Sequence, residues 1–480
     1  MIKLTDRRMV YKKGSFYEAP AGGDTKGREL TMAYRILADH NLSGNKDNLK
    51  IKFDAMASHD ITYVGIIQTA RASGLRDFPI PYVLTNCHNS LCAVGGTINE
   101  DDHMFGLSAA KKYGGIFVPA HQSVIHSYMR ECFAGCGKMI LGSDSHTRYG
   151  ALGTLAVGEG GPELVKQLLG RTYDISAPEV VAVHLTGKPR PGVGPHDVAI
   201  ALVGATFGSG FVKNRILEFV GDGISNLSMD FRCGIDVMTT ETTCLSSIWE
   251  TDEKTEKYLE LHGRASDYRK LSPADGATYD RLVEIDLSGI EPMIALPFHP
   301  SNAYTIREYL ENADDLLAMT EERAVKELSL PRGALDLRSK FYDGRFHVDQ
   351  GVIAGCAGGS YENLCAAADI LSGGSVGDGG FGLSVYPASQ PTLVELIRSG
   401  RASKLVDAGA ILHRFLRSLL RCGRRAAERR TVNKTFDEKL PEQGRLKADR
   451  RSDSRGRAHG FAFDRGNRRK RRRADACDRP

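Results

Sequence analysis

The sequence lacks the long apolar runs that membrane-spanning segments need. No stretch approaches the roughly 18 consecutive apolar residues of a transmembrane helix, which excludes such a helix. The first residues, MIKLTDRRMVYKKGSF, lack the apolar core of a signal peptide, so we expect the protein in the cytoplasm. Cysteine is sparse, at 10 of 480 residues, which excludes a disulfide scaffold. Each cysteine is therefore expected to be a buried apolar side chain, a metal ligand or a reactive thiol.

Charge is distributed unevenly along the chain. Residues 412–480 contain 23 Lys and Arg against 9 Asp and Glu, a net charge of +14. Residues 1–411 carry a net charge of −9, and the two together give the overall +5. This contrast predicts two different kinds of chain that join near residue 411. The length predicts about two to four domains.

Residues 1–411 alternate short apolar stretches with helical patterns. This alternation predicts an α/β fold of parallel sheets covered by helices, in which ligands bind beyond the carboxyl ends of the strands. The predicted strands include residues 80–84, 115–119, 138–142 and 180–184, and the predicted helices include residues 123–132, 163–169, 196–203 and 301–317.

Polar residues follow several predicted strands. They are His59-Asp60, Asn86-Cys87-His88, His121-Gln122 and the run Gly142-Ser-Asp-Ser-His-Thr147. The last run places a carboxylate, an imidazole and several hydroxyls on one turn, which can hold a proton-transfer pair beside a bound anion. The alternative is a turn that only satisfies its own backbone. Because histidines recur at the strand ends, catalysis is favoured over that alternative.

A fifth segment carries a cysteine between a predicted strand and a predicted helix. Residues 353–364 run from an apolar stretch through Gly355-Cys356 and several small residues into a helical pattern. A thiol near a helix N-terminus is stabilised as thiolate, which suits an iron–sulfur ligand. An inert cysteine in a glycine-rich turn fits this segment equally well.

Taken together, these segments resemble the aconitase superfamily over about residues 25–411, with the strongest likeness to aconitase-like hydratases of bacteria. The resemblance rests on Gly142–Thr147, Gly355-Cys356, Tyr361-Glu-Asn363, Gly204–Lys213 and Glu218–Gly221. It implies a hydro-lyase with a [4Fe-4S] cluster that moves water across a carbon–carbon bond of a small di- or tricarboxylic acid. It further implies aconitase-like α/β/α domains at residues 1–175 and 176–295, an incomplete third domain at 296–411, and a monomer.

The resemblance also assigns roles residue by residue. The implied roles are catalytic for His88, His121, Asp144 and His146, substrate-binding for Asp60 and Ser145, and cluster ligation for Cys356. Because these residues follow strands, we expect the catalytic side chains to converge on one cavity with the cysteine at its wall.

The sequence departs from the family pattern at three further positions. His59 stands where the family has Gln, Cys87 where it has Asp, and Met238 where it has a Glu beside the cluster. Either Asp236 or Glu241 could replace that Glu.

The resemblance stops at residue 411. The family continues with a Cys-x-x-Cys for the other two cluster ligands and later with a swivel domain, whereas residues 412–480 contain only Cys422 and Cys477. The composition of this segment fits a disordered basic tail, or an arm that contacts nucleic-acid phosphates through Asn467–Arg473.

A single-base frameshift explains more of this tail. With permitted codons, a one-base shift turns residues 414–422 into Ala-Phe-Cys-Gly-Pro-Cys-Phe-Gly-Ala, which contains the missing motif. The same shift turns residues 439–447 into Asn-Phe-Pro-Asn-Arg-Glu-Gly-Ser, which resembles the next stretch of the family. We therefore expect a hydro-lyase that is truncated in its third domain and inactive as written. A nucleic-acid-binding protein on an inactive enzyme scaffold, or a scaffold without chemistry, are the alternatives.

Overall fold

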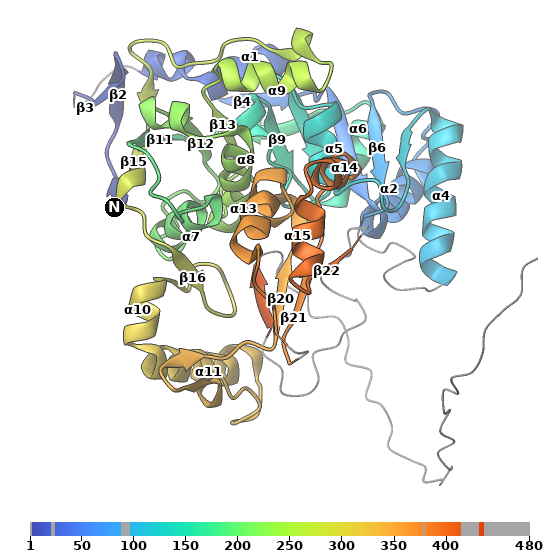
Figure 1. The fold of residues 1–480 in the computed structure, drawn as a ribbon. Coiled ribbons are helices and arrows are strands. Elements are labelled where there is room, and N and C mark those ends of the chain that lie inside the picture. Colours follow the sequence, from blue (N-terminus) through green and yellow to red (C-terminus); the bar gives the residue numbers. More distant parts are fainter. Residues whose placement is uncertain (1, 21–24, 88–96, 378–379, 414–431, 436–480) are drawn as a thin grey trace, which may run out of the picture. The chain divides into compact units, whose positions relative to one another are not determined.

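Three sheets built mainly of parallel strands organise the chain, and helices pack against them (Figure 1). The structure, a computed structural model, describes residues 2–20, 25–87, 97–377, 380–413 and 432–435. The predicted α/β fold is confirmed. Within the described residues, no helix combines the length and apolar character that crossing a membrane requires.

The first sheet is entirely parallel and is formed by residues 55–158. Its strand order is β7 (Ile116–Val118), β6 (Tyr82–Thr85), β5 (Ala55–His59), β8 (Met139–Gly142) and β9 (Leu155–Gly158). Its helices are α2 (Asp60–Ala72), α4 (Thr97–Tyr113), α5 (Ile125–Cys132) and α6 (Gly161–Leu168). Every residue of β5, β6 and β8 is buried, as expected for strands that are covered on both faces.

The second sheet gathers strands from both ends of the first 286 residues. Its order is β1 (Ile2–Thr5), β15 (Arg281–Asp286), β11 (Val180–Thr186), β12 (Ile216–Val220) and β13 (Ser246–Trp249), with β1 antiparallel to β15. Helices α7 (Pro195–Thr206) and α8 (Met229–Met238) pack with this sheet. Alternate residues of β5 and β11 enter the same two hydrophobic cores, so the first two sheets share their interior.

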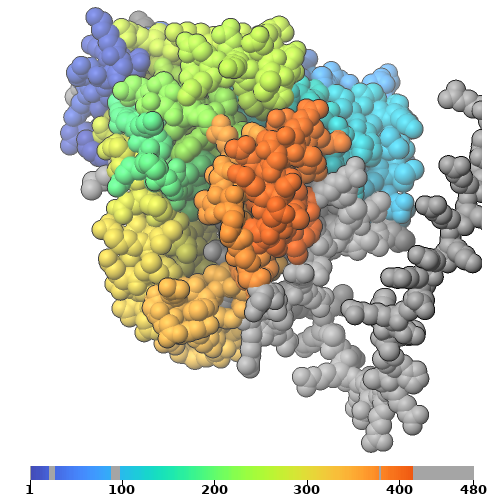
Figure 2. All heavy atoms as spheres, in the orientation of Figure 1, coloured from blue at the N-terminus to red at the C-terminus, as the bar shows by residue number. Residues whose placement is uncertain are grey.

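The third sheet is parallel, in the order β22 (Ile411–Leu412), β21 (Gly382–Val385), β20 (Gln350–Ile353) and β23 (Val432–Thr435). Its helices are α12 (Gly355–Gly358), α13 (Tyr361–Leu371), α14 (Gln390–Arg398) and α15 (Arg401–Asp407). Large apolar side chains on these helices face solvent, with Ile370 84%, Ile397 60% and Val406 54% exposed. Figure 2 shows the surface of these helices in orange and red.

The predicted helix at residues 301–317 is wrong at its start. The chain first forms a hairpin of β16 (Met293–Ala295) and β17 (Ala303–Thr305), followed by α10 (Ile306–Glu311) and α11 (Ala313–Leu328). The Thr305 hydroxyl accepts from the backbone of Glu308, whose carboxylate accepts from the backbone of Thr305. This capping box fixes the helix start at residue 306.

The remaining elements connect or cover these sheets. They are β2 (Met9–Lys12), β3 (Ser15–Glu18) and β14 (Thr278–Tyr279) in one small sheet, the pair β4 (Asn48–Ile51) and β10 (Tyr173–Ser176), the pair β18 (Phe341–Tyr342) and β19 (Arg345–Phe346), and helices α1 (Met32–His40) and α9 (Glu253–Leu261).

Candidate functional site

Asp144 lies at the centre of the candidate site, on the tight turn that follows β8. Its backbone carbonyl accepts from the backbone N–H of Thr147 at 3.1 Å and from the Thr147 hydroxyl at 2.7 Å. A Cβ atom at Gly142 would collide with the Thr147 side chain, so this turn requires glycine there. The Asp144 side chain is buried, and its Oδ1 accepts from the backbone N–H of His146 at 2.7 Å.

Three imidazoles surround the Asp144 carboxylate. His126 Nε2 lies 3.0 Å from Oδ1, His146 Nδ1 lies 3.5 Å from Oδ1, and His59 Nε2 lies 3.5 Å from Oδ2. These histidines come from α5, from the turn itself and from the end of β5. The turn therefore does more than satisfy its own backbone, because it brings a buried carboxylate into contact with side chains from two other elements.

Electrostatics keep this carboxylate ionised. Burial by itself would raise the pKa of Asp144, but attraction to His126 and His146 and their hydrogen bonds hold it well below its usual range. For His126, burial lowers the pKa of the imidazole, and the nearby Asp144, which acts to raise that pKa, only partly offsets the effect of burial. The centre of the site is therefore a buried carboxylate whose nearest imidazole is disfavoured as a cation.

A second carboxylate continues the network. Glu241, in the short 3₁₀ helix Thr239–Thr242 after α8, places Oε1 3.2 Å from His146 Nε2 and Oε2 3.5 Å from His299 Nε2. Asp236, the alternative from the sequence, is buried elsewhere and accepts from the Ser247 hydroxyl at 2.7 Å and the Trp249 indole at 2.9 Å. Glu241, and not Asp236, therefore lies at the candidate site.

The two predicted substrate-binding residues lie differently. Ser145 is exposed, and its hydroxyl is 3.3 Å from His146 Nδ1. Asp60 is buried at the start of α2, where its Oδ2 lies 3.3 Å from Nε2 of His103. Asp60 directly follows His59, so the end of β5 brings it beside the network.

Two further histidines were predicted to be catalytic, His88 and His121, and the structure describes only the second of them. His121 follows β7 in a left-handed conformation, with φ of +74°. The backbone that follows His121 is hydrogen-bonded to the segment in which β21 leads into α14. The Val124 N–H donates to the carbonyl of Ala388, and the Gln390 N–H donates to the carbonyl of Gln122. His88 lies outside the described residues.

Helix α5 connects the Asp144 network with the predicted cluster ligand. Arg130 lies one turn after His126 and donates to the backbone carbonyls of Cys356 at 3.1 Å and Cys233 at 3.3 Å. Cys356 is buried in the first turn of α12. Asp144 and Cys356 therefore contact successive turns of the same helix.

The donor set for a [4Fe-4S] cluster is incomplete among the described residues. A cubane with one open iron takes three thiolates, and Cys356 occupies the position that the resemblance assigns to the first. Among the residues that the structure places, no group of three or more His, Cys, Asp or Glu side chains is arranged to hold a metal ion. Cys422 and Cys477 lie outside the described residues. We therefore derive no reaction step through a cluster.

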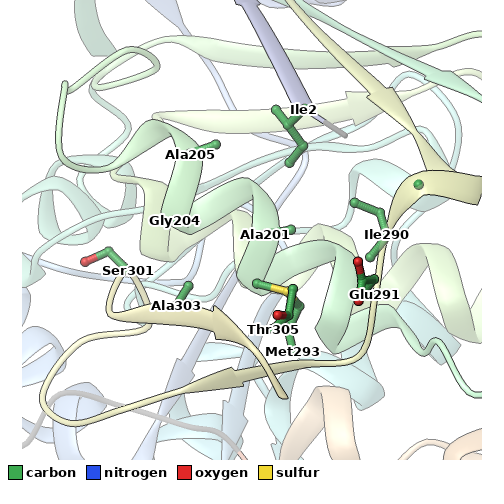
Figure 3. Close-up of a pocket in the computed structure, with 11 residues that line it drawn as sticks. Ile2, Ala201, Gly204, Ala205, Ile290, Glu291, Met293, Ser301, Ala303 and Thr305 are labelled. Atoms are coloured by element: carbon green, nitrogen blue, oxygen red, sulfur yellow. The ribbon is translucent and has the colours of Figure 1, made fainter. Parts of the chain in front are cut away.

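A separate hollow of about 310 Å³ lies between α7 and the β16–β17 hairpin (Figure 3). Of the eleven described residues that line it, only Glu291 is ionisable, and it forms an ion pair with Arg307 at 2.8 Å. Ser301 on its rim contacts Nδ1 of His299 at 2.9 Å. The lining contains none of the acid–base side chains of the Asp144 network, so this hollow is not the candidate site.

Two histidines of the network were not predicted from the sequence. His126 lies within a helix, and His299 lies in a hairpin loop, where its ring stacks on Phe207 with centroids 3.9 Å apart. His126 follows no strand, and His299 follows β16, a strand that the sequence did not predict, so the strand-end pattern that identified the other residues could not find them. The one local signal for His126 is its spacing of four residues from Arg130.

Comparisons with known proteins agree on one family. A model of the aconitase family (aconitate hydratase) matches residues 34–415. The mitochondrial aconitate hydratase of Saccharomyces cerevisiae is 28% identical over 416 residues, covering 80% of this chain and 49% of that protein. The 3-isopropylmalate dehydratase large subunit of Clostridium kluyveri is 30% identical over 399 residues, covering 80% of this chain and 84% of that protein. The mitochondrial homocitrate dehydratase of S. cerevisiae is 28% identical over 384 residues, covering 72% of this chain and 45% of that protein.

The share of each relative that this chain covers differs. The chain spans about half the length of the aconitate hydratases that it matches. The family match ends at residue 415, four residues after the point where the resemblance stops in the sequence.

Proposed function

The chain belongs to the aconitase family, and from this premise we propose that its described core is built for the hydration and dehydration of a small di- or tricarboxylic acid. The observation that carries the proposal is the buried, ionised Asp144 with three imidazoles within 3.5 Å. A hydro-lyase must move protons to and from a leaving hydroxyl and a carbon atom, and paired carboxylates and imidazoles are suited to that work.

We assign proton transfer to the residues around this carboxylate. His146 lies between two carboxylates, with Asp144 Oδ1 3.5 Å from its Nδ1 and Glu241 Oε1 3.2 Å from its Nε2, so each ring nitrogen can exchange a proton with a nearby acid. The exposed Ser145 hydroxyl beside it is placed to meet a substrate oxygen. The same proposal gives catalytic roles to His88 and His121 and a substrate-binding role to Asp60.

A [4Fe-4S] cluster, when bound, would supply a Lewis acid for the substrate hydroxyl. We propose Cys356 as one of its ligands. We also propose that the chain as written is inactive as a hydratase, because residues 412–480 contain no Cys-x-x-Cys to provide the other two. The end of the family match at residue 415 supports a frameshift near that point, and the nucleotide sequence of the gene there tests it.

The function is tested by anaerobic iron–sulfur reconstitution of this polypeptide and of a chain with the frame repaired. Both are then analysed for iron and assayed for hydratase activity with citrate, isocitrate and 3-isopropylmalate. We expect the repaired chain to gain both cluster and turnover on one of these acids, and the chain as written to gain neither. A repaired chain that binds the cluster but turns over none of the three acids would contradict the proposed reaction.

The cytoplasmic location, the monomeric state and the possibility of nucleic-acid binding through residues 412–480 stay predictions. Nucleic-acid binding by the tail would be salt-dependent and would be lost when those residues are deleted.

A further inference from the structure

His299 lies between a backbone donor and the carboxylate of Glu241. It belongs to the loop of residues 296–302 that joins β16 to β17, in which Figure 3 also shows Ser301. Its Nε2 lies 3.5 Å from Glu241 Oε2, and its Nδ1 lies 3.1 Å from the backbone nitrogen of Ser301. Both side chains are largely buried, with 11% of His299 and 10% of Glu241 exposed. An imidazole therefore reaches the proton-transfer network from a hairpin that belongs to neither of the first two sheets.

The backbone N–H of Ser301 determines where His299 carries its hydrogen. An amide N–H can only donate, so His299 Nδ1 accepts in this bond and cannot carry a hydrogen of its own. The Ser301 hydroxyl, 2.9 Å from the same nitrogen, can donate or accept and therefore does not determine the tautomer. A ring without a hydrogen on Nδ1 is neutral and carries its one hydrogen on Nε2, the nitrogen that faces Glu241.

His40 is a matched reference within the same chain. Its Nε2 also lies close to a carboxylate, 2.9 Å from Asp54 Oδ2, but its Nδ1 lies 2.8 Å from the backbone carbonyl of Ile36. A carbonyl can only accept, so these two partners favour a ring with a hydrogen on each nitrogen. Burial lowers the pKa of His40, yet its bonds to Asp54 and Ile36 outweigh burial and raise it. His40 and His299 should therefore differ in protonation within one molecule.

The flat face of the His299 ring is held as well. The ring stacks on Phe207, at the end of α7, with centroids 3.9 Å apart and an angle of 30° between the planes. Ser301 holds one nitrogen and Phe207 covers one face, so the ring has little freedom to turn its Nε2–H away from Glu241.

The backbone around Glu241 is held from the other side of the site. The hydroxyl of Thr240 donates to the backbone carbonyl of Ser145 at 2.7 Å, which attaches this segment to the turn after β8. The carboxylate itself can still rotate about its last bond. His299 acts on Oε2 of Glu241, while Oε1 lies 3.2 Å from His146 Nε2.

We propose that His299 is a positioning residue that directs the Glu241 carboxylate toward His146, and that the backbone N–H of Ser301 keeps His299 in the Nε2-protonated form that this requires. A donor at Oε2 leaves Oε1 as the oxygen that shares a proton with His146. His299 acts through Glu241 and delivers no proton to the substrate itself. The inference rests on the proposed function for its catalytic meaning, but not for its geometry.

Histidine nitrogen NMR of the full chain, labelled with ¹⁵N at its 14 histidines, tests the tautomer. The signals of the two rings are assigned by their loss in His299→Gln and His40→Gln. At pH 7 we expect His299 to show a neutral ring with its hydrogen on Nε2, and His40 to show more imidazolium. An imidazolium or an Nδ1-protonated ring at His299 would overturn the inference.

Ser301→Ala separates the backbone N–H from the hydroxyl. This variant keeps the N–H and removes the hydroxyl, so the hydrogen of His299 should stay on Nε2. A ring that becomes protonated at Nδ1 in this variant would show that the hydroxyl selects the tautomer, and would overturn the role given to the backbone.

Two variants of His299 separate positioning from packing. His299→Phe keeps a ring that can stack on Phe207 but removes the N–H, whereas His299→Gln keeps an N–H and removes the stacking. We expect the ring signals of His146 to shift in the Phe variant and to stay close to those of the parent in the Gln variant. Equal shifts in both variants, or a shift in the Gln variant alone, would contradict the positioning role. If His299→Phe fails to fold by circular dichroism, His299→Gln and Ser301→Ala still decide.

Turnover of the frame-repaired chain tests whether His299 acts through Glu241. His299→Phe should lower kcat by about tenfold with a smaller effect on KM, and His299→Gln should recover most of that loss. In a chain that already carries Glu241→Gln, His299→Phe should have no further effect, because the carboxylate that it positions is gone. A further tenfold loss in that background would contradict the proposal.

The two kinds of measurement keep this inference apart from the proposed function. Absent turnover in the repaired chain, together with the expected NMR result, would contradict the proposed function and leave the geometry of His299 supported.

Discussion

At the scale of single residues, burial and hydrogen-bond partners decide which histidines carry charge. Burial lowers the pKa of His196 in α7 to about 4 and also lowers that of His126. The partners of His40 act in the opposite direction and raise its pKa. The same side chain therefore contributes to stability with opposite pH dependence at different positions.

His196 gives a prediction with a definite sign. Its folded pKa of about 4 lies below the ordinary value of 6.5, so the unfolded chain binds a proton first as the pH falls. Stability is therefore fully present above pH 6.5 and is lost on the way down to pH 4. The loss from this one residue is up to about 3 kcal/mol. Urea unfolding at several pH values should show a flatter profile for His196→Leu than for the parent between these limits, and identical profiles would contradict the prediction.

His40 should behave in the opposite way. Because its folded pKa is raised, its contribution is fully present below pH 6.5 and is lost as the pH rises through the folded value. In the same urea series, His40→Gln should lose stability relative to the parent at pH 6 and lose less at pH 9. A difference that grows with pH would contradict the assignment of its partners.

The residues of the network show how far sequence patterns reach. Asp144 and His146 could be predicted because they follow a strand that ends at a glycine. Glu241 was one of two alternatives, and only tertiary packing distinguishes it from Asp236, since the two are five residues apart on consecutive helices. His126 could not be predicted, because its role arises when α5 packs against the turn after β8.

At the scale of elements, the turn after β8 depends on the absence of a side chain at Gly142. Its neighbours leave no room for a methyl group, whereas Gly65 in the middle of α2 has open space around it. Gly142→Ala should therefore cost about 1–3 kcal/mol through overpacking. Gly65→Ala should stabilise by about 0.5–1 kcal/mol, because alanine favours a helix. Denaturant unfolding of both variants checks this, and equal effects would contradict it.

Helices and strands could be predicted from the sequence where the local pattern of apolar and polar residues determines them. Three strands of the first sheet, β6, β7 and β8, lie within two residues of their predicted positions, because buried apolar runs that end in polar turns are a strong signal. The helix predicted at residues 301–317 failed because residues 303–305 pair with residues 293–295, and the capping box at Thr305 starts the helix later. The pairing of β1 with β15 joins residues about 280 apart, and no local pattern indicates it.

At the scale of the whole molecule, the helices of the third sheet expose large apolar side chains to solvent. Ile370, Ile397 and Val406 on α13, α14 and α15 are each more than half exposed. We expect this surface to promote self-association of the chain. The double variant Ile370→Lys, Ile397→Lys should stay monomeric at higher concentration than the parent, as measured by light scattering. The exposed variant Glu260→Lys on α9 adds the same two units of charge without removing an apolar side chain, so it serves as the control for added charge and should not help as much.

The central claim is that Asp144 is the acid–base centre of a hydro-lyase. Its most direct test is the rate of hydration by the frame-repaired chain carrying Asp144→Asn. Asp54→Asn, which removes the carboxylate paired with His40, is the control. We predict that Asp144→Asn lowers kcat by about 10²–10⁴-fold with the cluster content unchanged, whereas Asp54→Asn stays close to the parent. Equal rates for Asp144→Asn and the parent would contradict the account.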